Sequence, residues 1–320
     1  MISNPLPMRD ALLDRIWQSM GEDKKIFFLS ADFGSPILDK IRRDFPERFI
    51  NVGIAEQNLI NISAGLALEG YTVFAYAIAP FLTMRCYEQI RVSLALMSEV
   101  RDINVNLIGV GAGYSYVVSG PTHQCYEDIT LMRALPNFQV LSPADHVTAE
   151  ALFEVCIKNS GPKYLRLDAQ VLPSIYHSIK PDIVAGFNVL NKGQEICMLS
   201  TGYMTHTALK VVHALKENKV NVGLIDLFNI SHFSPDAILK EINGYSKLVT
   251  MEEGFRGRGG VDSMMFSFLS MHYPTIRILN LGVEGMYRFE LGSREELHEK
   301  AGIGPKFALR AIENFIGHNF

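Results

Sequence analysis

Short apolar runs alternate with longer segments of helical periodicity along most of this 320-residue chain. Strands are predicted at IFFLSAD (26–32), TVFAYAIA (72–79) and INVNLIGVGAG (103–113), and helices at SPILDKIRRDF (35–45) and MRCYEQIRVSLALM (84–97). Strands with so little polar interruption are buried on both faces, which is typical of parallel sheets covered by helices on both sides. The alternation therefore predicts an α/β fold of three-layer α/β/α type with mostly parallel sheets.

The alternation is interrupted once, between about residues 170 and 190. The segment QVLPSIYHSIKPDIVAGFNVLNKG contains two prolines and two glycines and has no regular period, whereas strand and helix patterns resume after it. A chain of this length also exceeds the usual size of one domain. We therefore expect two α/β/α domains, at residues 1–175 and 191–320, joined by a linker at 176–190.

Composition excludes several classes of protein. The formal net charge of −4 gives no support for a nucleic-acid partner. The four cysteines lie far apart, without a C-x-x-C pair, and predict buried thiols in a reducing compartment. The N-terminus lacks the layout of a signal peptide, and no apolar run is long enough to span a membrane. We expect a cytoplasmic protein with no membrane or nucleic-acid partner and no metal-ligating residues of its own.

Candidate functional residues follow the predicted strands, where ligands gather in open α/β sheets. Glu56 lies in VGIAEQN, Phe81 in AIAPF and His123 in GPTHQ, so the three are expected to converge on one sheet edge. Each has a structural alternative: Glu56 as a residue favoured by the helix dipole, Phe81 as core, and His123 as an ordinary loop residue. The P-loop, H-E-x-x-H and G-x-S-x-G motifs are absent from the sequence.

Taken in order, these phrases resemble the C-terminal half of transketolase-type, thiamine-diphosphate-dependent enzymes. The resemblance rests on SADFG, FINVGIAEQN, GLALEGYTVFAYAIAPF, GPTHQ, ALPNFQVLSPADHVTAEAL and YLRLD. VGIAEQ is nearest to deoxyxylulose-phosphate synthases, and the β subunits of 2-oxo acid dehydrogenases are also similar. The resemblance implies a pyrimidine-binding domain followed by a transketolase C-terminal domain.

The same resemblance implies a role for each residue at the sheet edge. Glu56 matches the glutamate that hydrogen-bonds N1′ of the cofactor's aminopyrimidine, which allows the 4′-imino group to act as a base. Phe81 and Tyr87 match the aromatic pocket for the pyrimidine ring. At the position of Met84, transketolases often have another aromatic residue, whereas synthases have an arginine. Arg85 could correspond to that arginine if the alignment is offset by one residue. Asp32, in SADFG, is also placed among the cofactor-binding residues.

Substrate binding is implied for four residues. His123 matches the loop histidine that contacts the donor's reacting oxygen. Arg9 and Arg166 match positions that hold the phosphate of a sugar phosphate, and a surface or interdomain ion pair is the alternative for both. Ser119 occupies the position of an acidic residue that reads a sugar hydroxyl, which suggests a donor or acceptor other than an ordinary pentose phosphate.

Ser119 is one departure from the family pattern, and a second one is larger: no GDG tripeptide occurs in the 320 residues. In full-length relatives that motif belongs to the domain that binds Mg²⁺ and the diphosphate. We therefore expect one subunit of a split transketolase, working with an N-terminal diphosphate-binding subunit that holds Mg²⁺. An α2β2 assembly is expected, with self-dimer contacts through both domains.

The expected activity is transfer of a two-carbon ketol unit between phosphorylated, sugar-like substrates. Two alternatives stay open: a 2-oxo acid dehydrogenase β subunit or deoxyxylulose-phosphate-synthase-like enzyme, and a non-catalytic homologue with a scaffolding role.

Overall fold

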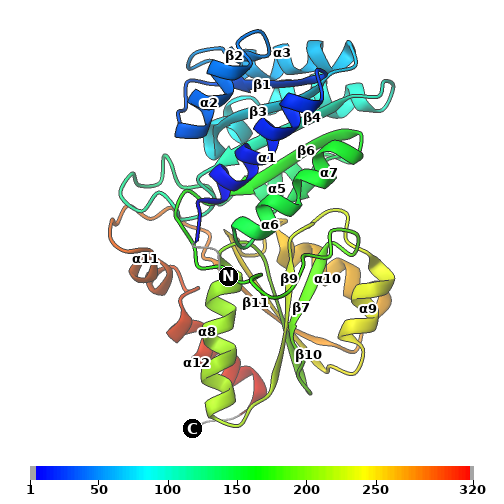
Figure 1. Cartoon of the computed structure of the whole chain (residues 1–320). Coiled ribbons are helices and arrows are strands. Elements are labelled where there is room, and N and C mark those ends of the chain that lie inside the picture. The colour runs from blue at the N-terminus through cyan, green and yellow to red at the C-terminus, as the bar shows by residue number, and fades with distance from the viewer. Residues whose placement is uncertain (1–4, 318–320) are drawn as a thin grey trace.

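Two sheets, each covered by helices on both faces, make up the computed structural model, which describes residues 5–317 (Figure 1). The N-terminal sheet has the order β2-β1-β3-β4-β6-β5, and all of its neighbouring strands are parallel. Its strands are β1 (Ile26–Ser30), β2 (Phe49–Asn51), β3 (Thr72–Ile78), β4 (Asn104–Val110), β5 (Gln139–Leu141) and β6 (Gly161–Leu167). The prediction of a mostly parallel α/β/α fold is thus confirmed for this domain.

Alternate residues of the N-terminal strands supply two cores, because successive side chains of a strand point to opposite faces. Phe28 and Phe74 pack beneath one group of helices, and their neighbours Leu29 and Val73 pack beneath the other. The first group is α1 (Met8–Glu22), α2 (Pro36–Asp44), α6 (His146–Ala151) and α7 (Phe153–Lys158). The second contains α3 (Glu56–Leu68), η1 (Phe81–Arg85), α4 (Tyr87–Gln89), η2 (Ile90–Leu96) and α5 (Asp128–Arg133).

The helix predicted at 84–97 is present in a modified form. It consists of the wider π-helical turns η1 and η2, separated by the short α4. Such turns are rare and frequently lie at functional sites. The periodicity of apolar residues predicted a helix here, but it does not distinguish a π-helical turn from an α-helical one.

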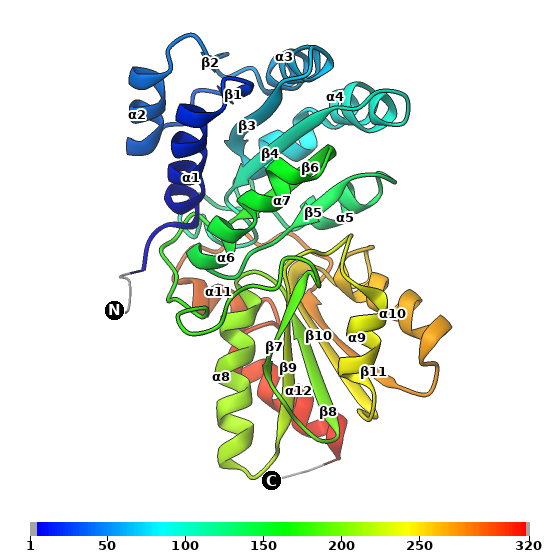
Figure 2. The ribbon, with the colours of Figure 1, turned by 45° about the vertical axis from the view of Figure 1, so that its right-hand side comes forward.

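The C-terminal sheet has the order β11-β10-β8-β9-β7 and is parallel except at its β7 edge. Its strands are β7 (Phe187–Asn191), β8 (Ile196–Ser200), β9 (Val222–Leu227), β10 (Lys247–Phe255) and β11 (Arg277–Val283). The helices are α8 (Met204–Glu217), α9 (Pro235–Ile242), α10 (Val261–His272), α11 (Arg294–Lys300) and α12 (Pro305–Ile316). Helices α8 and α12 cover one face of the sheet, and α9 and α10 cover the other (Figure 2).

The expected linker at 176–190 needs a correction, because β7 begins within it at Phe187. This antiparallel edge strand is only half-buried along most of its length, so it lacks the continuous apolar run that marked the parallel strands. The first residue of the linker is also held in place. Asp145 accepts hydrogen bonds from the backbone N–H groups of Tyr176, at 2.9 Å, and of Ile175 just before the linker, at 2.7 Å.

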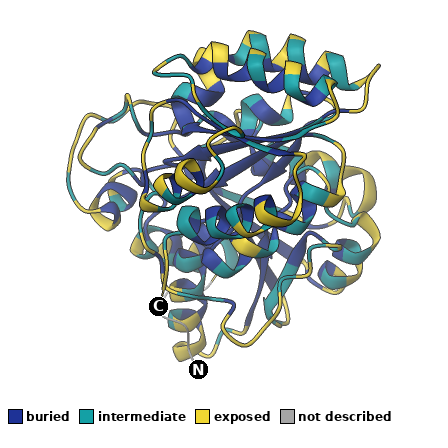
Figure 3. Cartoon of the chain, turned by 45° about the horizontal axis from the view of Figure 1, so that its top comes forward, coloured by how far each residue is buried: buried dark blue, intermediate teal, exposed yellow. Residues whose placement is uncertain are grey.

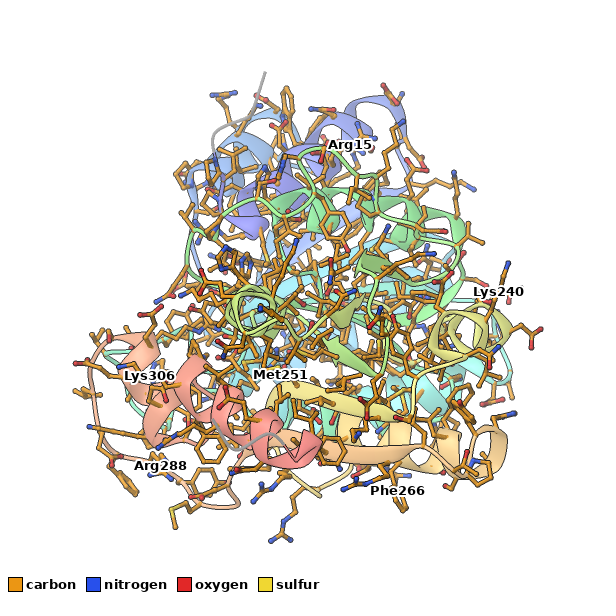
Figure 4. The ribbon with its side chains drawn as sticks, turned by 90° about the horizontal axis from the view of Figure 1, so that it is seen from below. Arg15, Lys240, Met251, Phe266, Arg288 and Lys306 are labelled. Atoms are coloured by element: carbon orange, nitrogen blue, oxygen red, sulfur yellow. The ribbon has the colours of Figure 1, made fainter. Side chains whose placement is uncertain are left out.

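Burial follows the layered arrangement, with the sheets buried and the outer faces of the helices exposed (Figure 3). In the C-terminal domain, Met251 of β10 lies in the interior, whereas Phe266 of α10 points outward (Figure 4). Among residues 5–317, none of the helices has the length and apolar character required to cross a membrane.

Candidate active site at the carboxyl edge of the N-terminal sheet

Glu56 is the first residue of α3 and follows β2 through a short loop. That loop turns at Gly53, whose φ of +71° favours glycine. Only 3% of Glu56 is exposed, although it is a charged residue. The N-terminus of α3 favours a negative charge at this position. A glutamate that merely favours the helix dipole is usually exposed to solvent. Glu56 is buried, so the structural alternative does not describe it well.

Arg85 is the direct partner of Glu56. Its Nη1 donates to Glu56 Oε2 over 2.7 Å, and its guanidinium carbon lies 4.7 Å from the centre of the Phe81 ring. Arg85 ends η1, and Gln57 donates to its backbone carbonyl at 3.3 Å. The arginine side chain is 45% exposed, so one planar group links a buried carboxylate, an aromatic ring and solvent.

His123 also contacts Phe81. The two rings meet edge to face, with centroids 5.2 Å apart, and His123 Nδ1 is 3.0 Å from Thr122 Oγ1. The contacts thus run from Glu56 through Arg85 and Phe81 to His123. The prediction that Glu56, Phe81 and His123 converge on one edge of the sheet is confirmed, while their roles remain proposals.

The other expected cofactor-binding residues surround this group less directly. Arg85, rather than Met84, stacks on Phe81, and Met84 is 40% exposed. Tyr87 packs against the core, and its hydroxyl donates to the Leu131 carbonyl at 3.0 Å. Asp32 is exposed just after β1 and accepts from Asn51 Nδ2 at 3.0 Å.

The two arginines expected to bind a phosphate differ in accessibility. Arg9 of α1 is partly exposed and bonds its neighbour Asp10 at 2.8 Å. Arg166 of β6 is fully buried, and its Nε donates to Asp128 Oδ2 at 2.8 Å. For Arg166 the structure therefore differs from the phosphate-binding expectation, because the guanidinium is closed off from a substrate. Its ion pair is buried within the N-terminal domain, and so it is not the surface or interdomain pair of the alternative either.

Ser119 is exposed in the loop that carries His123. Sequence reasoning missed Tyr116 in the same loop, whose ring centroid lies 6.2 Å from that of His123. Burial raises the pKa of Tyr116 to about 12, and its hydroxyl has no hydrogen-bond partner within residues 5–317. Tyr116 fits because Gly111 has no side chain: a Cβ there would lie 2.2 Å from the tyrosine ring. Gly111, in GVGAGY, is the sequence feature that could have indicated a closely packed side chain here.

Fold and site together define a two-domain α/β protein with Glu56, Arg85, Phe81 and His123 in contact at the carboxyl edge of its N-terminal sheet. The profile described as transketolase, pyrimidine binding domain, matches residues 4–174, and that described as transketolase, C-terminal domain, matches residues 186–306. The chain belongs to the transketolase family.

Several relatives have a similar length. An apulose-4-phosphate transketolase subunit of Actinobacillus succinogenes is 30% identical over 262 residues, which is 82% of each chain. The protein of the same name from Phocaeicola vulgatus is 27% identical over 99% of each chain. A solved structure described as a split gene transketolase, inactive beta4 tetramer, matches with a TM-score of 0.84 at 29% identity, covering 97% of this chain and 98% of that one. A Pichia stipitis transketolase shares the fold, with a TM-score of 0.81 at 19% identity, and this chain covers 47% of its length.

Proposed function

We propose that this chain is the pyrimidine-domain subunit of a split transketolase. In this proposal it transfers a two-carbon ketol unit between phosphorylated, sugar-like substrates, using thiamine diphosphate. The observation that carries the proposal is the arrangement around Glu56: a buried carboxylate that accepts a hydrogen bond from a planar group stacked on Phe81.

The residues present fit the cofactor's aminopyrimidine. The Arg85 guanidinium is planar, rich in nitrogen and a hydrogen-bond donor, and it contacts both the Phe81 ring and the Glu56 carboxylate. An aminopyrimidine ring that carries a proton at N1′ has the same three properties. A planar donor of this kind is therefore accommodated between Phe81 and Glu56, and Arg85 has room to leave because nearly half of its side chain is exposed.

Each residue of the site then has a physical task. When bound, thiamine diphosphate supplies the nucleophilic carbon that carries the two-carbon unit. Glu56 holds a proton at N1′ of the aminopyrimidine, and Phe81 fixes the plane of that ring. His123, at the edge of Phe81, hydrogen-bonds the reacting oxygen of the donor and stabilises the charge that develops there. Arg9 remains the candidate for the substrate's anionic group, and Ser119 for one of its hydroxyls.

The substrate class is supported by the names of the relatives. Two of them are apulose-4-phosphate transketolase subunits, and a Clostridium relative at 27% identity is a 6-deoxy-6-sulfo-D-fructose transketolase subunit. Phosphate and sulfonate are both tetrahedral anions that a partly exposed arginine binds well. These relatives favour a transketolase over a dehydrogenase, a synthase or a scaffold.

The proposal includes a partner. An N-terminal diphosphate-binding subunit would hold Mg²⁺ and the diphosphate in an α2β2 cytoplasmic assembly, in which copies of this chain pair through both domains. Support comes from the relatives that are named as single subunits of a transketolase, one of which matches along 99% of both chains.

Calorimetry of thiamine diphosphate and Mg²⁺ with this chain, alone and together with a GDG-bearing partner, tests the proposal. We expect binding and turnover only with the partner. In the complex, Glu56→Ala should abolish turnover and leave assembly intact, whereas Glu88→Gln, at an exposed glutamate near the site, should behave as wild type. Tight binding without the partner, or a fully active Glu56→Ala complex, would contradict it.

A further inference from the structure

The loop that carries His123 and Ser119 is closed at its base by two backbone hydrogen bonds. Gly113 and Cys125 pair in a short antiparallel bridge, with N–O distances of 2.9 and 3.0 Å. Between these two roots the chain reaches the surface at Val118, Ser119 and Thr122. The position of His123 therefore depends on what holds the roots.

Glu253 of the C-terminal domain holds the first root. It lies in the part of β10 where the register with β11 shifts, and such irregularities re-aim side chains. Its Oε1 accepts from the backbone N–H of Tyr114 at 3.2 Å. A Cβ on Gly113 would lie 2.3 Å from Glu253 Oε2, so the loop backbone rests directly on the carboxylate.

Glu253 is itself fixed by two residues of α11. Arg294 binds both carboxylate oxygens, with Nη2–Oε2 at 2.7 Å and Nε–Oε1 at 3.1 Å, and His298 Nε2 lies 2.6 Å from Oε1. Burial raises the pKa of Glu253, but Arg294 and His298 outweigh it and hold that pKa well below its ordinary value. Arg294 also donates to Asp168 Oδ2 at 2.5 Å, just after β6, and so spans the two domains.

The second root is held from the same side. Arg166 Nη2 donates to the carbonyls of Glu253 at 3.0 Å and Cys125 at 3.4 Å, which links the root to β10. Farther out, the Tyr287 hydroxyl donates to Glu127 Oε1 at 2.8 Å. Tyr287 belongs to the segment that leads into α11, and Figure 1 shows this orange segment beside the blue-green loop.

We propose that Glu253, Arg294 and His298 are positioning residues for His123, so that the C-terminal domain sets the geometry of the site without touching substrate. This inference rests on the proposed function for the role of His123. Both roots of the loop are held by buried, charge-assisted hydrogen bonds, which are about twice as strong as neutral ones. Displacements of about 1 Å at a catalytic group cost about a hundredfold in rate, so loosening these roots should lower turnover.

The chain contains its own reporter for the loop root. Cys125 is fully buried, and burial raises the pKa of its thiol well above the ordinary value, so it reacts only when the root opens. Cys156 and Cys197 are buried in the cores of the two domains and report unfolding of each. Thiol labelling followed by mass spectrometry of this chain separates the three sites and needs neither partner nor substrate.

Arg294→Lys keeps the charge and removes the two-pronged contact with Glu253. We expect Cys125 to be labelled about tenfold faster, with Cys156 and Cys197 unchanged. The control is Arg133→Lys, because Arg133 is also an arginine that joins the two domains, although it is only partly buried. Its Nη1 donates to the Gly260 carbonyl at 2.9 Å, and it is not bonded to the loop. This control should leave the Cys125 rate at the wild-type value.

Two substitutions of His298 keep Arg294 in place and are therefore less prone to misfold. His298→Leu removes the contact with Glu253 Oε1 and should raise the Cys125 rate by about threefold, whereas His298→Gln restores a donor and should return it towards wild type. In the active complex, Arg294→Lys should lower kcat by about tenfold or more, with cofactor affinity changed less than about twofold.

Equal Cys125 rates in Arg294→Lys and Arg133→Lys would overturn the inference. So would acceleration of all three cysteines together, because that result reports global unfolding. A normal kcat in an Arg294→Lys complex with accelerated Cys125 labelling would also refute positioning of His123. An inactive wild-type complex would instead refute the proposed function, and the labelling result would be unaffected.

Discussion

Replacing Asp226 by asparagine should change how the stability of this protein depends on pH. Asp226 of β9 is fully buried, and its carboxylate accepts hydrogen bonds from the Tyr176 hydroxyl at 2.7 Å and Thr205 Oγ1 at 2.8 Å. Tyr176 belongs to the segment between the domains, so this aspartate fastens that segment to the C-terminal sheet. Burial raises the pKa of Asp226 from 3.8 to about 7, and the two hydrogen bonds oppose the rise only in part.

The direction of the effect follows from proton binding. Between pH 3.8 and about 7 the folded protein keeps a proton on Asp226 that the unfolded chain has released. The free energy of unfolding therefore falls as pH rises through this range, and the loss is complete above about pH 7. Integrated between about pH 5 and pH 8, this single group removes about 2–3 kcal/mol of stability. Asparagine has the same shape and no charge, so Asp226→Asn should not show this loss.

Urea unfolding at pH 5 and pH 8 measures the difference. The stability of Asp226→Asn relative to wild type should rise by about 2–3 kcal/mol between the two pH values, whatever constant cost the altered hydrogen bonds impose. Glu252, whose pKa burial also raises to about 7, titrates in both proteins and cancels from the comparison. Asp102→Asn, at an exposed aspartate, is the matched control and should follow wild type. Parallel pH dependence of Asp226→Asn and wild type would refute the reasoning.

Three further changes address the site. Arg85→Gln removes the ion pair that cofactor binding has to break, so calorimetry of the assembled complex should show affinity higher by about threefold to tenfold; weaker binding would make Arg85 a cofactor ligand. Gly111→Ala introduces a Cβ against the Tyr116 ring at a φ of +109°, and steady-state kinetics should show a kcat lower by about tenfold or more because Tyr116 adjoins His123. Ser119→Asp restores an acidic residue, and kcat/KM for a pentose-phosphate ketose should rise; an unchanged value would remove Ser119 from the specificity argument.

Periodicity predicted much of the fold because burial repeats along the chain. The mostly apolar residues of 103–113 fit a strand buried on both faces, and β4 occupies that place in the sheet. The same logic located the site, since parallel strands end at one edge, and Glu56, Phe81 and His123 follow three of them. These inferences succeed because they depend on neighbours along the chain and on the direction of the strands.

Contacts between distant segments could not be predicted in this way. YLRLD shows that Arg166 lies on a strand, but not that Asp128, 38 residues earlier, neutralises it inside the protein. Likewise, the sequence around Glu253 reads as a strand, and nothing local indicates that its carboxylate supports the backbone of another domain. Ion pairs depend on three-dimensional proximity, so sequence patterns identify the charged residue and leave its partner open.

The pairing of Glu56 with Arg85 also decides which residue moves when another donor enters the site. Glu56 is enclosed at the start of α3, so leaving its place would require the helix itself to shift. Arg85 is 45% exposed, and its guanidinium can exchange one hydrogen bond for water at little cost. The exchange is therefore asymmetric: the carboxylate stays fixed, and the arginine gives way. A ligand that stacks on Phe81 and donates to Glu56 meets a preorganised acceptor, and its affinity is reduced only by the weak, half-exposed ion pair that it replaces.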